Sequence, residues 1–197
     1  MIAEKRHQKI VDALRIEVSR DAYLIIKNHG EPDDYPNEPI QVNIYGYMDT
    51  DDGSEETWVV SASAYLFDRK LCWEEADDFS EDTANIAEVI CDGNGEIKTR
   101  YSNGWGSTAC FMDRIFVPEE LRECGIASIL QKNLKEVIQR VVPDLCGIYA
   151  YAAPWELKDD HDAFQKRQKE LIRFYKKFGF KQIKGTPVIW MPVDEPS

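Results

Sequence analysis

The chain of 197 residues carries 36 Asp and Glu against 24 Lys and Arg, a formal net charge of −12, and 43% of its residues are hydrophobic. A chain of this length can bury one sizeable core, so we expect a single domain over residues 1–197. The negative charge argues against nucleic acid or an anionic membrane as the main partner and favours a cationic one.

The N-terminus and the cysteines indicate where the protein works. No apolar run approaches the length of a membrane span, and residues 1–18 have scattered charges where a signal peptide has an apolar core, so we expect a soluble, cytoplasmic protein. The five cysteines form no C-x-x-C pair, and there are only three histidines. We therefore expect reduced, half-buried cysteines and no metal site.

The first half of the chain predicts mostly strands. Loosely spaced apolar residues predict a helix over 2–14, and β-rich residues then predict one strand over 15–28. Three prolines among acids predict a loop over 31–39. Apolar and polar residues alternate over 40–48, and a second strand over 58–68 follows turn residues, so these two strands are expected to pair as a hairpin.

The middle of the chain alternates helices and strands. Helix formers over 73–91 predict one helix, which a Ser80-x-x-Thr83 start favours. A strand over 107–117 precedes a long amphipathic helix over 126–142. An apolar run over 145–152 then predicts a buried strand.

The C-terminal segment predicts a helix and a hairpin. Residues 159–180 have helical apolar spacing that Gly179 closes as a C-terminal cap. Two short strands follow over 180–185 and 188–193. This order of elements predicts an α/β domain in which helices flank a mixed central sheet.

The corner at residues 117–127 has no side-chain cap for the helix that follows. A helix start leaves four backbone N–H groups without partners, so a ligand phosphate can take the place of a cap. Gly125 lets the backbone approach such a ligand closely, and Ala127 keeps the helix start uncluttered. Glu123 opposes an anion there unless its side chain points to solvent. The alternative is that Gly125 serves the turn alone.

Two motifs in this order resemble those of a known family. The first is a strand, a turn and an R-x-x-G-x-A helix start, matched by Val117, Pro118, Arg122, Gly125 and Ala127. The second is F-Y-x-K-x-G-F, matched by Phe174, Tyr175, Lys177, Gly179 and Phe180. Together they resemble the GNAT family of acyl-CoA-dependent N-acetyltransferases, over roughly residues 108–193. Residues 1–107 carry no motif of the family.

The resemblance implies a single-domain GNAT fold whose sheet is splayed between the strands at about 108–117 and 145–152. It implies acetyl-CoA or a related short acyl-CoA as cofactor, with the pantetheine arm along the backbone of Ile115, Phe116 and Val117. The amides implied to hold the pyrophosphate are those of Arg122, Glu123, Cys124, Gly125, Ile126 and Ala127. Tyr175 matches the tyrosine that protonates the departing CoA thiolate in many members, although an aromatic at helical spacing is also typical of a core.

The general base is the least determined role. Asp113 lies mid-strand on the face of Phe111 and Ile115, where an apolar setting would raise its pKa toward a useful range. An ion pair with Arg114 is the structural alternative, and a water chain or an already neutral amine would serve equally well. The asparagine that often follows the second strand in the family is absent, so the pantetheine end of the cofactor is expected to be held differently.

The resemblance places the acceptor pocket before the first motif, within residues 68–107. Trp105 lies between glycines where it can cover a substrate, and acids at 74–82 favour a cationic small-molecule or peptide amine. Residues 98–184 carry many of the Lys and Arg residues, so any anionic ligand is expected in the C-terminal half. We leave open whether the chain forms a homodimer.

These features predict transfer of an acyl group from acyl-CoA to a primary amine by direct attack in a ternary complex. The alternative is a noncatalytic acidic interaction protein on a GNAT scaffold, which binds a basic partner or mimics DNA.

Overall fold

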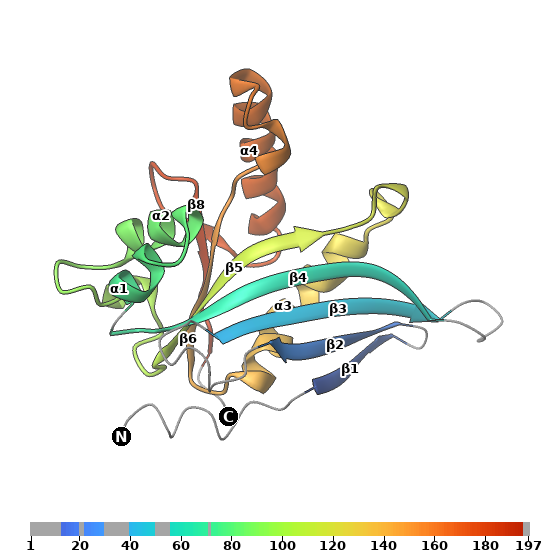
Figure 1. Ribbon diagram of the computed structural model, residues 1–197, viewed down its shortest axis with the longest axis horizontal. Helices are drawn as coiled ribbons and strands as arrows, with labels where there is room; N and C mark the ends of the chain where they lie inside the picture. Colours follow the sequence, from blue (N-terminus) through green and yellow to red (C-terminus); the bar gives the residue numbers. More distant parts are fainter. Residues whose placement is uncertain (1–12, 20–21, 30–39, 50–55, 71, 195–197) are drawn as a thin grey trace. The chain divides into compact units, whose positions relative to one another are not determined.

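The computed structural model describes residues 13–19, 22–29, 40–49, 56–70 and 72–194 (Figure 1). It divides into two compact units. The first unit consists of Met1–Leu66 and Asp113–Pro143, and the second of Phe67–Met112 and Asp144–Ser197. The expectation that residues 1–197 behave as a single domain stays a prediction.

Four antiparallel strands run through the first unit in chain order. They are β1 (Ala13–Ser19), β2 (Ala22–His29), β3 (Ile40–Asp49) and β4 (Glu56–Asp68). The hairpin expected at 40–48 and 58–68 is confirmed, and its ladder runs from Ile40 opposite Leu66 to Asp49 opposite Glu56.

The expectation of one strand over 15–28 is wrong, because that stretch folds back on itself. Ser19 pairs with Ala22, so β1 and β2 form a hairpin of their own. Folding back lets each half satisfy the backbone hydrogen-bonding groups of the other. Most of the helix expected over 2–14 lies outside the described residues, and its last two positions belong to β1.

The two faces of β3 and β4 differ sharply in burial. Val42, Ile44, Ala62 and Ala64 are buried, whereas the residues that alternate with them are only partly so. Helix α3 (Ile126–Val141) lies behind these strands in Figure 1 and contributes its own buried side. That side consists of Ile126, Leu130, Gln131, Leu134, Val137, Ile138 and Val141.

The sheet of the second unit is mixed. The first residues of β5 (Thr108–Phe116) pair in parallel with β6 (Leu145–Tyr151), from Thr108 opposite Leu145 to Met112 opposite Ala150. Strand β8 (Val188–Met191) pairs antiparallel with β6, and β7 (Lys181–Gln182) pairs antiparallel with β8. The expected α/β class with a mixed sheet and flanking helices is confirmed.

The single helix expected over 73–91 is two helices, α1 (Cys72–Asp77) and α2 (Glu81–Ile90). Ser80 caps α2, because its hydroxyl accepts a hydrogen bond from the Thr83 amide. The Thr83 hydroxyl in turn accepts a hydrogen bond from the Ser80 amide. This reciprocal cap favours a new helix start over continuation of α1. The buried side of α2 contacts β6 and β8.

Helix α4 (His161–Lys176) begins at Asp160, whose carboxylate accepts the Ala163 amide. Gly179 follows its end with φ of 96°, a left-handed conformation that suits glycine. Short 3-10 turns complete the described elements: η3 (Thr99–Tyr101), η4 (Glu119–Leu121) and η5 (Trp155–Leu157). All five cysteines are free thiols, and four of them are buried.

Candidate functional site

The loop between β5 and α3 lies wholly in the first unit and turns twice through left-handed conformations. After η4, Glu123 has φ of 67° and Gly125 has φ of 82°. Gly125 is the N-cap residue of α3, and no side chain in the described ranges caps that helix start. The expectation of an uncapped helix beginning after Gly125 is therefore confirmed.

Five consecutive backbone N–H groups in this loop have no acceptor within the described part of the chain. They belong to Glu123, Cys124, Gly125, Ile126 and Ala127. The first intrahelical bonds of α3 begin only with the amides of Ser128 and Ile129, both of which donate to the Gly125 carbonyl. Successive free amides in such a turn, at the positive end of a helix dipole, form a binding place for an anion.

The surroundings of the loop both favour and oppose an anion. A Cβ atom on Gly125 would meet nothing within 4 Å, so the space beside this residue is open. Arg122 is exposed and its Nε donates to the Val117 carbonyl at 3.3 Å, which ties the loop to the end of β5. The exposed carboxylates of Glu119 and Glu123 act against negative charge at the same place.

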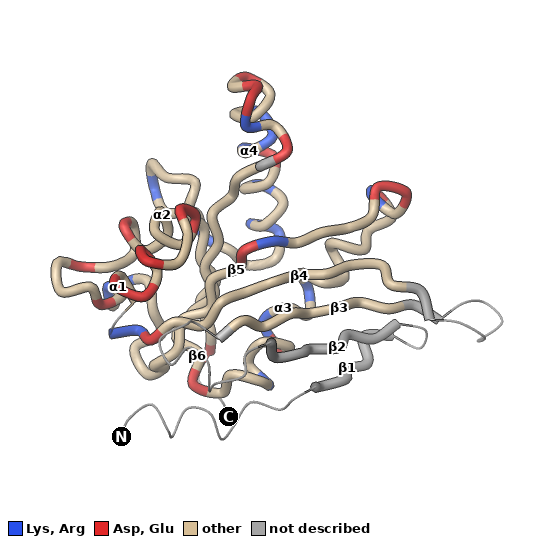
Figure 2. The backbone as a smooth tube through the Cα atoms, in the orientation of Figure 1, with Lys and Arg blue, Asp and Glu red and all other residues tan. Residues whose placement is uncertain are grey.

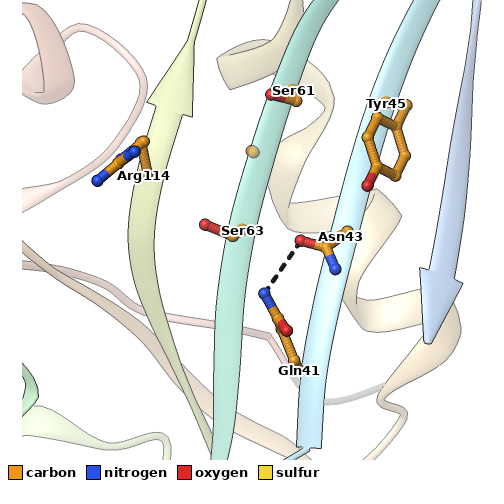
Figure 3. Close-up of a pocket in the computed structure, with 7 residues that line it drawn as sticks. Gln41, Asn43, Tyr45, Ser61, Ser63 and Arg114 are labelled. Atoms are coloured by element: carbon orange, nitrogen blue, oxygen red, sulfur yellow. Dashed lines mark hydrogen bonds between the residues drawn. The ribbon is translucent and has the colours of Figure 1, made fainter. Parts of the chain in front are cut away.

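A hollow of about 180 Å³ lies on the less buried face of β3 and β4 (Figure 3). Asn43 stands opposite Ser63 and Tyr45 opposite Ser61, so the lining comes in cross-strand pairs. Its full lining is Gln41, Asn43, Tyr45, Ser61, Ala62, Ser63 and Arg114. Apart from Arg114 these side chains are uncharged, and most of them are hydrogen-bonding, which suits a small polar ligand.

Asp113 lies beside this hollow. The Ser63 hydroxyl donates to its carboxylate over 2.9 Å, from Oγ to Oδ2. The apolar setting expected for Asp113 is not found: its side chain is exposed, because β5 leaves the buried part of its sheet after Met112. Burial raises the pKa of the nearby Tyr65, and the Asp113 carboxylate raises it further, while Arg114 lowers it.

The three residues expected to lie along a pantetheine arm end β5 and begin the loop. Ile115 and Val117 are half-buried, whereas Phe116 is exposed. The Phe116 ring stacks on that of Trp58 in β4, with centroids 5.7 Å apart and planes 6° apart. Two exposed, parallel aromatic rings offer a flat apolar surface. No sequence pattern indicates this pair, because only strand register brings the two residues together.

Tyr175 belongs to the second unit, on the inner side of α4. Its ring packs edge-on against Phe174 and Phe180, with centroids 5.7 and 5.2 Å apart. Burial of its hydroxyl group raises the pKa of Tyr175 to about 12. The phenol therefore keeps its proton at neutral pH and can donate a hydrogen bond, while it is a weaker acid than an exposed tyrosine.

The segment around Trp105 is held by Asn103, a residue that no sequence motif marks. Asn103 Oδ1 accepts the amides of Trp105 and Gly106, and its Nδ2 donates to the carbonyls of Leu145 and Val193. These four hydrogen bonds restrain the loop, whereas a lid over a substrate has to move. The Trp105 indole N–H is buried and has no hydrogen-bond partner among the described residues.

Among the described residues, no group of three or more His, Cys, Asp and Glu side chains is arranged to hold a metal ion. No described helix combines the length and apolarity needed to cross a membrane.

Comparison with known proteins gives only distant structural likenesses. No protein-family model and no curated protein matches the sequence. The chain is similar in structure to Arabidopsis thaliana NAA60 in complex with acetyl-CoA, at TM-score 0.41 and 20% identity, over 73% of this chain and 64% of that one. It is also similar to a bacterial toxin, at TM-score 0.40 and 13% identity, over 76% of this chain and 66% of that one.

This chain thus spans less than two thirds of the length of either structure. At such TM-scores and identities, the two likenesses establish neither a family nor an activity for it.

Proposed function

We infer that this protein is a GNAT-type N-acetyltransferase, which transfers an acetyl or related short acyl group from acyl-CoA to a primary amine. The observation that carries the proposal is the run of five unpartnered amides from Glu123 to Ala127 at an uncapped helix start. A diphosphate needs several backbone donors close together, and this loop has five in succession that are free within the described part of the chain. The residues of the first motif, from Val117 to Ala127, lie in this loop and at the helix start that follows it.

The residues present fit the diphosphate of coenzyme A. The amides of residues 123–127 would hold it, Gly125 leaves the approach open, and the Arg122 guanidinium adds positive charge. When bound, the coenzyme supplies the thioester whose carbonyl carbon the amine attacks. The backbone of Ile115, Phe116 and Val117 is proposed to guide the arm that carries this thioester.

Two side chains are proposed for proton transfer. Asp113 would accept a proton from the acceptor amine, and the Ser63 hydroxyl would orient its carboxylate. The Tyr175 hydroxyl, protonated at neutral pH, would donate a proton to the departing sulfur. No metal ion is required, since the attack needs only a neutral amine, a polarised carbonyl and an acid for the leaving group.

The hollow beside Asp113 is the proposed place of the acceptor. The amide and hydroxyl side chains that line the hollow suit a polar amine. Because the hollow lies in the same unit as Asp113, an amine bound there would lie near the proposed base. The acids in the first turns of α1 and α2 favour a cationic acceptor by their charge. The acceptor is thus proposed to be a small hydroxylated or amide-bearing amine, or a peptide amine.

Thermal shift with two matched ligands tests the cofactor site. Acetyl-CoA should raise the melting temperature, whereas acetyl-pantetheine, which has the same thioester and no diphosphate, should raise it much less. Release of free thiol should then be followed against a panel of primary amines. Equal shifts with both ligands would contradict the diphosphate site, and binding without turnover would favour a noncatalytic protein.

A further inference from the structure

The second unit carries a strongly basic segment in an otherwise acidic protein. Residues 161–184 contain eight Lys and Arg and two Asp and Glu, a formal charge of +6. Residues 31–92, by contrast, contain 18 Asp and Glu and two Lys and Arg. Figure 2 shows Lys and Arg along α4 and acidic residues on α1 and α2. The net charge of −12 therefore hides a local cationic surface.

Four of these cations share one face of α4. Lys166, Lys169, Arg173 and Lys176 are spaced by three, four and three residues, and all four are exposed. This spacing places successive side chains on one side of a helix, about 4.5 or 6 Å apart along its axis. The four residues, called the α4 basic stripe, span about 15 Å. The opposite side of α4 carries the less exposed Leu171, Ile172 and Tyr175.

No ion pair holds a residue of the stripe within the described part of the chain. None of its four residues has a carboxylate partner there, and the nearby Arg167 is the residue that pairs with Glu170. Lys176 only donates to the Gln182 side chain, at 3.0 Å. Four unpaired cations on one exposed face favour association with a ligand that carries repeated negative charges.

The side chains exposed on α4 indicate which class of anionic partner the helix suits. Protein interfaces depend on buried aromatic or apolar anchors, and membrane-binding helices insert apolar side chains. Among the described residues, the exposed large hydrophobic side chains are Trp58, Phe79, Phe116 and Ile129, none of which lies on α4. A phosphodiester backbone requires cations alone. We propose that the α4 basic stripe binds the phosphate backbone of a nucleic acid.

The overall charge does not prevent this binding at physiological salt. Charges further apart than about 8 Å are largely screened at 0.15 M ionic strength, so distant acids affect the stripe less than the charges on α4 itself do. The proposal does not depend on acyl transfer, because none of the four residues belongs to the site proposed for it.

Fluorescence anisotropy with a labelled oligothymidylate of about 20 nucleotides tests the proposal. Four phosphate contacts to a single strand predict a slope of about −2.8 in a plot of log K against log salt concentration. The affinity should therefore fall about 50-fold between 50 and 200 mM KCl. Replacing all four stripe residues by Gln should abolish binding at 50 mM KCl.

A control variant with the same net charge separates the stripe from overall electrostatics. It replaces four other exposed cations, Arg100, Lys132, Arg140 and Lys158, by Gln, and it should retain the wild-type affinity within about twofold. Equal loss in both variants, no binding by the wild type at 50 mM KCl, or stronger competition by polyglutamate than by unlabelled oligonucleotide would overturn the proposal. Thermal shift with acetyl-CoA should be the same in all three proteins.

Discussion

Ser63 and Asp113 lie fifty positions apart in the chain, and the Ser63 hydroxyl donates a 2.9 Å hydrogen bond to the Asp113 carboxylate. This bond joins β4 to the end of β5 at the border of the polar hollow. It gives an exposed carboxylate a preferred orientation, which a general base requires.

Replacement of Asp113 by Asn should lower the turnover number by about 10²- to 10⁴-fold if Asp113 is the base, because the amide cannot accept the proton of the amine. Affinity for acetyl-CoA should stay unchanged. Ser63→Ala should lower turnover less, since it removes only the orienting bond. Steady-state kinetics with a saturating amine measure both effects, and wild-type turnover in the Asn variant would assign the base elsewhere.

Gly125→Asp should abolish binding of acetyl-CoA, because it puts a carboxylate among the free amides and a Cβ on a left-handed residue. Gly185→Asp is a matched control, since Gly185 has φ of 81° and equally open surroundings in the turn before β8. Both variants carry the same added charge and similar strain. Isothermal calorimetry with acetyl-CoA should show loss in the first and near wild-type affinity in the second.

Tyr175→Phe should lower turnover about 10²-fold or more while leaving the affinity for acetyl-CoA nearly intact, because it removes an acid and little volume. A fall in both quantities together would indicate a packing role against Phe174 and Phe180 instead. Thiol release and thermal shift on the same preparations distinguish the two outcomes.

The raised pKa of Tyr175 predicts a loss of stability at alkaline pH. The folded hydroxyl titrates at about 12 and the unfolded one near 10, so the folded state holds more protons in between. This contribution to stability is complete below pH 10 and declines as the pH rises toward 12. In Tyr175→Phe the free energy of unfolding should decline less between pH 10 and 12. Urea unfolding at several pH values measures this decline, and an identical decline in both proteins would contradict the raised pKa of Tyr175.

The buried side of α3 should dominate the stability of its unit. Leu134 is fully buried, so Leu134→Ala should lower the free energy of unfolding by about 2–5 kcal/mol. Ile129 lies on the same helix and is 45% exposed, so Ile129→Ala should change it by less than about 0.5 kcal/mol. Urea denaturation monitored by circular dichroism compares the two, and similar losses would mean that α3 packs differently.

Periodicity and local chemistry determined much of this protein. The alternation in β3 and β4, the apolar spacing of α3 and α4, and the uncapped glycine before α3 follow from contacts within a few residues. The two predictions that were wrong also have local causes. The expected single helix was interrupted by the cap at Ser80, and the expected single N-terminal strand by the reversal after Ser19.

Only the tertiary structure decided which side chains meet. The hydrogen bond from Ser63 to Asp113 and the stacking of Trp58 on Phe116 depend on which residues of β4 lie beside β5. A shift of one residue in strand register would turn each side chain to the other face of the sheet. The register is selected because it buries one whole face of the strands against α3. The free energy of that burial is a sum over residues far apart in the chain, so no single stretch of sequence determines it.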